Sequence, residues 1–293
     1  MPRIMQTDLS QHRGAVLEWY RPRRQAYAWR RGRRNAYRTL VSEVMLQQTQ
    51  AARVEPSFEA FVARFPRVDA LAAASRADVL RAWSGLGYNR RAVALHEAAR
   101  TIVREHRGRV PNDMGALIRL PGVGPYTASA VVSIGYGASV AALDGNVRRV
   151  VARAVRGAEP DEVDAADLAS DAQAWLDPTA PGDWNQAIMD IGRLHCRPAP
   201  RCEDCPLAPR CRFRGAGRAG RPSGRRQSRF EGSPRQVRGA VVRELRSVRS
   251  ASAEALAERT GHTLAAVATA TTVLTTEGII ERTRSGRFRL PRR

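Results

Sequence analysis

Residues 120–127 read LPGVGPYT, a turn with two glycines and two prolines between two apolar helical stretches. Pro125 suits the first turn of a helix, where its missing N–H costs nothing. Gly122 and Gly124 permit positive φ angles and a close approach of the backbone to another group. The segment therefore predicts a helix over 113–120, a tight turn and a second helix from Pro125, which together form a helix-hairpin-helix.

The turn also predicts an anion site. The backbone amides of Gly122, Val123 and Gly124, with the N-terminus of the next helix, can bind a phosphate, although an ordinary αα corner is the alternative. The chain has 49 basic and 28 acidic residues in 293, a formal net charge of +21. Such an excess favours nucleic acid as the partner over a ribosome-associated or merely basic protein.

Every one of the 49 basic residues is arginine, because the sequence contains no lysine. No side-chain primary amine is therefore present to form a Schiff base, and only the α-amino group could serve. The first ten residues contain no apolar core of a signal peptide, and no stretch has the length of a membrane span. We therefore expect a cytoplasmic, nucleoid-associated protein without a membrane partner, and a monomer.

Two carboxylates stand in sequence settings that suit opposite roles. Asp144, in LDGNVRRV over 143–150, precedes a helix and is a natural N-cap, worth about 1 kcal/mol. The helix dipole also favours its ionised form, which can stabilise a cationic sugar. Glu43, in VSEVMLQQTQ over 41–50, has apolar neighbours, and burial would raise its pKa and make it a proton donor. A solvated polar face that Glu43 shares with two glutamines is the alternative.

All four cysteines lie close together, at Cys196, Cys202, Cys205 and Cys211, with the spacing C-x5-C-x2-C-x5-C. Structural disulfides are rare in the cytoplasm, so the group indicates a metal site, with zinc or an iron–sulfur cluster as the two candidates. Zinc ribbons usually have two close pairs far apart, whereas here one close pair is flanked by two outlying cysteines. The spacing therefore favours a 4Fe-4S cluster.

The end of the chain reads as a separate module after a Gly/Arg/Ser/Pro-rich linker at 216–230. A helix is predicted from Pro234, a second from about Ala253 to Arg259, and a third from near Thr263 to Gly278. Two short strands, 279–282 and 287–290, follow. Three helices and a hairpin predict a winged-helix-like module over 231–293.

Taken together, five segments resemble the adenine DNA glycosylases of the helix-hairpin-helix superfamily. They are VSEVMLQQTQ at 41–50, GLGYNRRAVALHEAA at 85–99, LPGVGPYTASAV at 120–131, LDGNVRRV at 143–150 and the four cysteines. The resemblance implies an all-α, bilobal fold with a 4Fe-4S cluster loop, in which DNA binds across the groove between the lobes and the target adenine is flipped out. The implied domains are 1–35 with 146–215 as the cluster-bearing module, and 36–145 as a six-helix barrel that carries the hairpin.

The resemblance also implies roles for individual residues. Glu43 would protonate an adenine ring nitrogen, Asp144 would stabilise the oxocarbenium ion, and Tyr126 and Asn146 would assist, in a reaction similar to glycoside hydrolysis. The residues implied to contact DNA or the adenine pocket are Gln47, Gln48, Leu86, Tyr88, Gly122, Val123, Gly124 and Arg30. The substrate would be duplex DNA with adenine opposite 8-oxoguanine or guanine. With Tyr126 where related lyases supply an amine, the enzyme would be monofunctional.

The sequence departs from the family pattern twice. The first cysteine gap is five residues where six is common, and the tail is too short for the Nudix-like domain of many members. The tail could contact DNA through its basic wing or dock a repair protein. The alternative functions are a mismatch thymine DNA glycosylase and a non-enzymatic iron–sulfur winged-helix regulator; an endonuclease III-like lyase is disfavoured because it needs a lysine.

Overall fold

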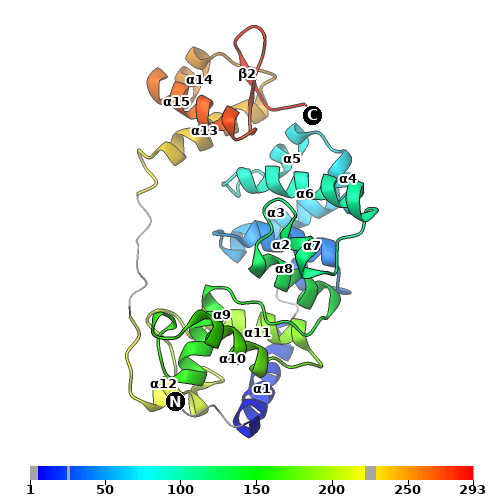
Figure 1. Cartoon of the computed structure of the whole chain (residues 1–293). Helices are drawn as coiled ribbons and strands as arrows, with labels where there is room; N and C mark the ends of the chain where they lie inside the picture. The colour runs from blue at the N-terminus through cyan, green and yellow to red at the C-terminus, as the bar shows by residue number, and fades with distance from the viewer. Residues whose placement is uncertain (1–5, 25–26, 222–228, 293) are drawn as a thin grey trace. The chain divides into compact units, whose positions relative to one another are not determined.

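The structure is a computed structural model that describes residues 6–24, 27–221 and 229–292. The described chain is built almost entirely of helices, with one small sheet near its C-terminal end (Figure 1). The predicted all-α class is therefore confirmed. Among the described residues, no helix combines the length and the apolar character needed to cross a membrane.

Contacts divide the chain into two compact units. Unit 1 comprises Met1–Glu43, Pro111–Arg119 and Val123–Arg225, and unit 2 comprises Val44–Val110, Leu120–Gly122 and Arg226–Arg293. The domain boundaries inferred from the sequence stay a prediction. Parts of the predicted arm, linker and C-terminal module, namely residues 1–5, 25–26, 222–228 and 293, lie outside the described residues.

Unit 1 begins with a helix that the sequence pattern did not predict, α1 (Gln6–Tyr20), in the arginine-rich arm. Its other α-helices are α2 (Ala36–Leu46, whose last residues belong to unit 2), α7 (Met114–Ile118), α8 (Pro125–Ala130), α9 (Gly145–Val151), α10 (Ala165–Trp175), α11 (Pro181–Leu194) and α12 (Arg212–Gly215). Single π-helical turns, Val131–Gly135 and Ala152–Arg156, extend α8 and α9. Short 3-10 turns lie at Arg21–Arg23, Ala28–Arg30, Pro160–Glu162 and Ala208–Arg210.

The core of unit 1 forms where α9, α10 and α11 pack together with α1. In α11, Trp184, Ala187, Ile188 and Ile191 recur at the spacing of one helix face, and all four are fully buried. Trp184 packs edge-on against Trp175 of α10, with ring centroids 5.7 Å apart. This core fixes α9 and α11, the two helices that carry much of the candidate site.

Unit 2 contains α3 (Ala51–Arg64), α4 (Val68–Ala73), α5 (Arg76–Ala82) and α6 (Arg90–His106). Helix α6 is amphipathic, and its buried face carries Leu95, Ala98 and Ile102. It packs along α4 and α5, so the loop that precedes α6 is anchored on a rigid helix.

The C-terminal module, also in unit 2, follows the predicted order of elements. It has α13 (Pro234–Ser247), α14 (Ala253–Thr260), α15 (Leu264–Thr276) and the antiparallel strands β1 (Glu281–Arg282) and β2 (Phe288–Arg289). Gly261 ends α14 in a left-handed conformation, as its place in the sequence indicates. The three helices and hairpin of a winged-helix-like module are confirmed.

Candidate active site

Glu43 lies near the end of α2 and is buried, with 6% of its surface exposed. The Tyr126 hydroxyl donates a hydrogen bond to its Oε2 at 2.7 Å. Burial raises the pKa of Glu43 from 4.5 to about 7; the Tyr126 hydrogen bond opposes this, the negative charge of Asp144 adds to it, and Arg30 lowers it. A carboxyl group with this pKa can hold a proton and donate it at neutral pH.

The alternative, a solvated polar face over Glu43, Gln47 and Gln50, is wrong. Helix α2 ends at Leu46, and Gln50 is the N-cap of α3, so the three side chains do not share one helix face. The short turn between these helices breaks the i, i+4, i+7 spacing that the sequence suggested.

Tyr126 comes from the second residue of α8, directly after the hairpin. Besides Glu43, its hydroxyl contacts the Met189 Sδ at 3.6 Å. Burial, with the nearby charge of Glu43, raises the pKa of Tyr126 well above its ordinary value. The phenol therefore stays neutral and keeps its proton for the hydrogen bond to Glu43.

Asp144 is the N-cap of α9, as one of the two interpretations of the sequence predicted. Its Oδ1 accepts a hydrogen bond from the Val147 backbone N–H at 2.7 Å, and its Oδ2 accepts one from the Asn146 Nδ2 at 2.9 Å. Two N–H donors at a helix N-terminus stabilise negative charge on the carboxylate. The cap and the predicted anionic role are therefore compatible.

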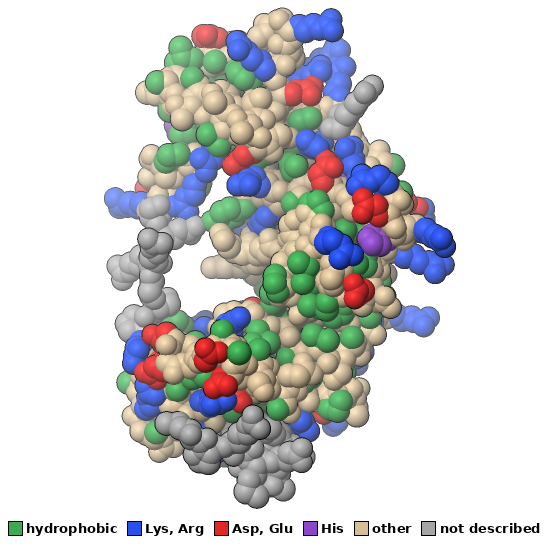
Figure 2. All heavy atoms as spheres, in the orientation of Figure 1, with side chains coloured by type: hydrophobic (Ala, Val, Ile, Leu, Met, Phe, Trp, Pro, Cys, Tyr) green, Lys and Arg blue, Asp and Glu red, His purple; other side chains and the backbone are tan. Residues whose placement is uncertain are grey.

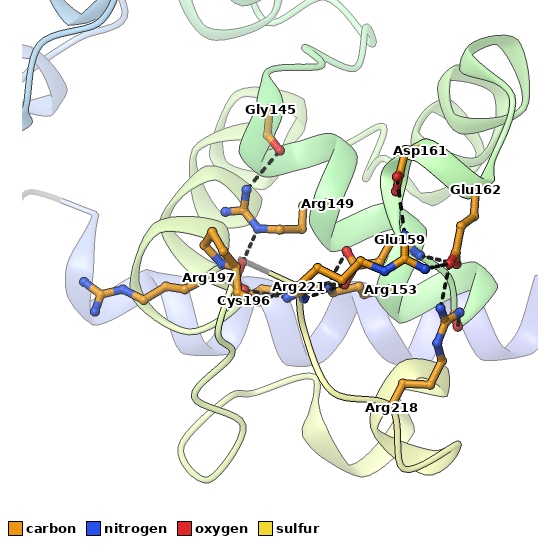
Figure 3. A network of polar contacts seen from close by, with 12 residues as sticks. Gly145, Arg149, Arg153, Glu159, Asp161, Glu162, Cys196, Arg197, Arg218 and Arg221 are labelled. Carbon is orange, nitrogen blue, oxygen red and sulfur yellow. Dashed lines mark hydrogen bonds and ion pairs between the residues drawn. The ribbon is translucent and has the colours of Figure 1, made fainter. Parts of the chain in front are cut away.

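Arg149, one turn further along α9, fixes the Asn146 amide. Its Nη2 donates to the Asn146 Oδ1 at 2.8 Å and to the Gly192 carbonyl at 2.9 Å. Its Nε donates to the Cys196 carbonyl, a contact drawn in Figure 3. Because the amide oxygen faces Arg149, the amide nitrogen faces Asp144. A Cβ on Gly192 would lie only 2.6 Å from the Asn146 Cβ, so only glycine lets α11 pass this close.

Arg30 pairs with Asp190 inside unit 1. Its Nη1 and Nη2 donate to the two carboxylate oxygens at 2.6 and 3.1 Å, and the side chains are 7% and 8% exposed. The pair lies near enough to Glu43 for the charge of Arg30 to lower the Glu43 pKa. Nothing in the sequence pointed to Asp190, and contact between Arg30 and DNA stays a prediction.

The four cysteines line one shared cavity, together with His195 and Arg153. None forms a disulfide. No set of three or more His, Cys, Asp or Glu side chains in the described part of the chain is arranged as a metal site. The four thiols that line the shared cavity are soft ligands of the kind that iron–sulfur clusters use.

A buried ion pair, Arg153 with Glu159, contacts the start of the cysteine loop, residues 196–211. Arg153 and Glu159 are 2% and 6% exposed, and the Arg153 guanidinium also donates to the Arg197 and Pro198 carbonyls (Figure 3). Arg218 and Arg221, from the start of the predicted linker, both form ion pairs with Glu162, and Arg221 also pairs with Asp161 (Figure 3). The sequence did not single out this network.

In unit 2, the four residues predicted to contact DNA from outside the hairpin lie on two loops with unusual backbone conformations, and the side chain of one of them, Leu86, is buried. Gln48 has φ 56° and Tyr88 has φ 45°, a left-handed region that non-glycine residues rarely adopt. Arg91 joins the loops: its Nη1 donates to the Gln47 carbonyl at 2.6 Å, and its Nη2 to the Leu86 carbonyl at 3.2 Å. Arg91 stands inside the run at 85–99 but was not singled out.

The hairpin turn approaches α6 closely at Gly122. Gly122 has φ 75°, and a Cβ there would lie 2.8 Å from the Ala94 Cβ, so the turn requires glycine for both reasons. The Gln47 Nε2 donates to the Gly122 carbonyl at 3.5 Å. In unit 1, Val123 is buried and Gly124 forms the N-cap of α8.

Comparison with known proteins places this geometry in a family. Residues 41–170 match the family described as HhH-GPD superfamily base excision DNA repair protein. An adenine DNA glycosylase of Mycolicibacterium smegmatis is 47% identical over 235 residues, which cover 79% of each chain. The Mycobacterium tuberculosis adenine DNA glycosylase is 42% identical over 284 residues, 94% of this chain and 92% of the relative.

Solved structures agree on the fold. A thermostable thymine-DNA glycosylase matches with a TM-score of 0.65 at 26% identity, over 72% of this chain and 98% of that one. An endonuclease III–DNA complex matches with a TM-score of 0.60 at 20% identity, over 73% and 100% of the two chains, which shows a shared fold only. With relatives above 40% identity along most of its length, the chain belongs to the adenine DNA glycosylase family of the HhH-GPD superfamily.

Proposed function

We propose that the protein hydrolyses the N-glycosidic bond of adenine that is paired with 8-oxoguanine or guanine in duplex DNA. One observation carries this proposal: Glu43 is buried and hydrogen-bonded to Tyr126, and burial raises its pKa to about 7. Asp144 accepts two N–H hydrogen bonds and lies near enough for its charge to raise the Glu43 pKa further. Ring protonation helps a purine to leave, so a carboxylic acid in this setting favours adenine over thymine.

In the proposed reaction, the protonated Glu43 donates its proton to a ring nitrogen of the flipped adenine. The bond between the base and C1′ then breaks, and its electron pair leaves with the base as neutral adenine. The Asp144 carboxylate stabilises the oxocarbenium ion that remains. Water forms the new bond to C1′ and gives its proton to the Glu43 carboxylate, which restores the acid and leaves an abasic site.

We further propose that the enzyme is monofunctional. A Schiff-base lyase step needs an amine at the sugar carbon, and the sequence has no lysine. Tyr126 stands directly after the hairpin and donates its only hydroxyl proton to Glu43. Strand breakage without added heat or base would contradict this point.

The residues on the two loops of unit 2 and on the hairpin turn would bind the DNA. Gln47 and Gln48 would probe or wedge the stack beside the flipped base. Leu86 and Tyr88, on the second loop that Arg91 holds, would contact the DNA, Leu86 through its backbone because its side chain is buried. The hairpin amides over 122–124 would bind a backbone phosphate. The exposed side chain of Tyr88, at 43%, is available for stacking on a base.

Cys196, Cys202, Cys205 and Cys211 would hold a 4Fe-4S cluster, which the shared cavity supports. When bound, the cluster would crosslink residues 196–211 and stabilise the loop that Arg149 and Arg153 contact. Iron and acid-labile sulfide in equal amounts, near four of each per chain, are expected; stoichiometric zinc would contradict the assignment.

The decisive test is base release from defined duplexes with A opposite 8-oxoguanine, A opposite G, T opposite G and A opposite T. We expect adenine release from the first two duplexes and none from the last two. Thymine release from the T·G duplex would move the protein to the mismatch thymine DNA glycosylases. Binding without release of any base would favour a non-enzymatic regulator.

A further inference from the structure

Net charge alone does not locate the surfaces that bind DNA. On the face shown in Figure 2, arginine side chains are spread over both units. Several arginines already pair with oxygens of the protein, as Arg30 does with Asp190 and Arg153 with Glu159. A second binding surface should therefore be sought where several arginines converge and some of them form no ion pair within the described part of the protein.

One such place lies in unit 2, where the C-terminal module meets α5. An open cavity of about 230 Å³ is lined there by four arginines and by no acidic side chain. They are Arg81 of α5, Arg249 after α13, Arg289 of β2 and Arg292 near the end of the chain. We name this feature the arginine pocket.

The arginine pocket has a defined architecture, because specific contacts dock the module on α5. The Arg246 guanidinium donates to the Leu80 carbonyl at 3.0 Å, to the Ser84 Oγ at 3.2 Å and to the Asn89 Oδ1 at 3.1 Å. The Ala77 backbone N–H, in the first turn of α5, donates to the Pro291 carbonyl at 2.9 Å. The second contact anchors the chain next to Arg292 and so helps to set one wall of the pocket.

The charges in the arginine pocket are only partly compensated. Arg81 lies 3.5 Å from Asp78, and Arg289 lies 2.6 Å from Glu281. Arg249 and Arg292 are exposed and form no ion pair with any acidic residue that the structure describes. An excess of guanidinium groups around one cavity favours an anion with several oxygens, which their planar N–H donors match in geometry.

The helix that a winged-helix protein would use for base contacts is unsuited to that role here. The exposed residues of α15 are uncharged, for example Ala268 and Thr272. The Thr272 and Thr276 hydroxyls donate back to carbonyls one turn earlier, at 3.0 and 3.1 Å. This face therefore presents mostly methyl groups, and it lacks the cationic and amide donors that read DNA.

We propose that the arginine pocket binds phosphates of the DNA backbone, so that α5 and the C-terminal module together form a second, sequence-independent DNA contact. This proposal rests on the proposed function in one respect, that the ligand is duplex DNA. The pocket supplies affinity and not base recognition, because guanidinium–phosphate contacts carry no sequence information. It would also give the C-terminal module a role in DNA binding.

The test uses the full chain with the double substitution Arg249→Ala/Arg292→Ala. The dissociation constant for a duplex without a mispair should rise about tenfold or more at moderate salt, and the slope of log Kd against log salt should fall by about one to two, since each phosphate contact contributes about 0.9. Single-turnover release of adenine at saturating enzyme should be unchanged, because neither residue touches the carboxylate pair.

The matched control is Arg238→Ala/Arg243→Ala, which removes the same charge from α13 outside the arginine pocket. An equal loss of affinity in this control would show a diffuse charge effect and overturn the proposal. Unchanged affinity and salt dependence in the pocket variant would also overturn it. Because the readout is binding of undamaged duplex, failure of base release by the unmodified protein would contradict the proposed function alone.

Discussion

The two carboxyl groups of the candidate site, Glu43 and Asp144, differ in their hydrogen-bond donors and in their place in the fold. Glu43 is buried and accepts a hydrogen bond from the Tyr126 hydroxyl, and its pKa is raised to about 7 mainly by burial. Asp144 begins α9 and accepts from two N–H groups, those of Val147 and the Asn146 side chain. One fold thus holds one carboxyl group ready to give a proton and the other ready to carry charge.

The two carboxyl groups also depend on different parts of unit 1. The support of Asp144 continues from Asn146 to Arg149 and on to the Cys196 carbonyl, so it reaches the cysteine loop. Glu43, in contrast, is held by the Tyr126 hydrogen bond and by none of the contacts that hold Asp144. Changes to the contacts of Asp144 should therefore alter the rate of base release at every pH. Changes to the Tyr126 contact of Glu43 should alter how that rate depends on pH, so the two effects can be measured separately.

The largest effect is expected from Asp144→Asn. Asparagine is as good an N-cap as aspartate, so α9 should keep its start while the negative charge is lost. Single-turnover release of adenine should fall on the order of 10³-fold, a magnitude typical for loss of a group that stabilises transition-state charge. The duplex dissociation constant should change less than about threefold.

Asp144→Ala is the matched variant for that experiment. It removes both the charge and the cap, so it should add a loss of about 1 kcal/mol in the free energy of unfolding. If Asp144→Asn kept base release while Asp144→Ala lost it together with duplex binding, the residue would act mainly as a structural cap, and the contrast with Glu43 would fail.

Glu43→Gln should lower base release about 10²- to 10³-fold, because glutamine can accept the Tyr126 hydrogen bond but has no proton to give. The unmodified enzyme should lose about tenfold in rate for each pH unit above the Glu43 pKa of about 7, as the acid form is depleted. The residual activity of Glu43→Gln should not follow that curve. If Glu43→Gln still lost activity above pH 7 in the same way, the pH dependence would belong to another titrating group.

The same substitution should change stability with a defined sign. A pKa raised by folding gives stability that is complete below the unfolded value of 4.5 and is lost as the pH rises through about 7. Near pH 8, where the buried carboxylate is charged, Glu43→Gln should therefore be more stable than the unmodified protein, by on the order of 3 kcal/mol. Denaturant unfolding at about pH 5 should show little difference between them.

Arg149→Met should lower base release about tenfold at every pH and leave the midpoint of the pH profile in place. Without the guanidinium, the Asn146 amide can rotate, and Asp144 loses a fixed donor while Glu43 keeps its own surroundings. Arg148→Met, next to it on α9, is the control and should have little effect. A shifted midpoint would show that Arg149 acts on Glu43 as well.

Much of the molecule could be predicted from local sequence. The hairpin, the N-cap at Asp144 and the helices of the C-terminal module depend on glycine, proline and capping residues whose effects act within a few positions. Gly261, for example, ends α14 in the left-handed conformation expected of it. The polar spacing of Glu43 with Gln47 and Gln50 misled for the same reason, since it assumed one helix where a turn intervenes.

The contacts that arrange the site could not be predicted in this way, because they join residues far apart in the chain. Asp190 is 160 residues from Arg30, and Gly122 is 75 residues from Gln47. With 49 arginines and no lysine, composition does not show which arginines are buried structural donors and which face outward. Arg91 and Arg149 stood within the segments that carried the resemblance, but only the structure shows which oxygens they bind.

Tyr126→Phe should give the smallest effect and the sharpest test of how Glu43 is tuned. The hydroxyl donates to the Glu43 carboxylate and lowers its pKa, against the larger effect of burial. Phenylalanine keeps the ring but removes the donor, so the midpoint of the pH profile should move to higher pH, by up to about one unit. At about pH 6, where the acid is protonated in both proteins, the rates should agree within about threefold. A large loss at every pH would mean that the hydroxyl acts on the substrate itself, and a midpoint moved to lower pH would mean that burial does not control the acid.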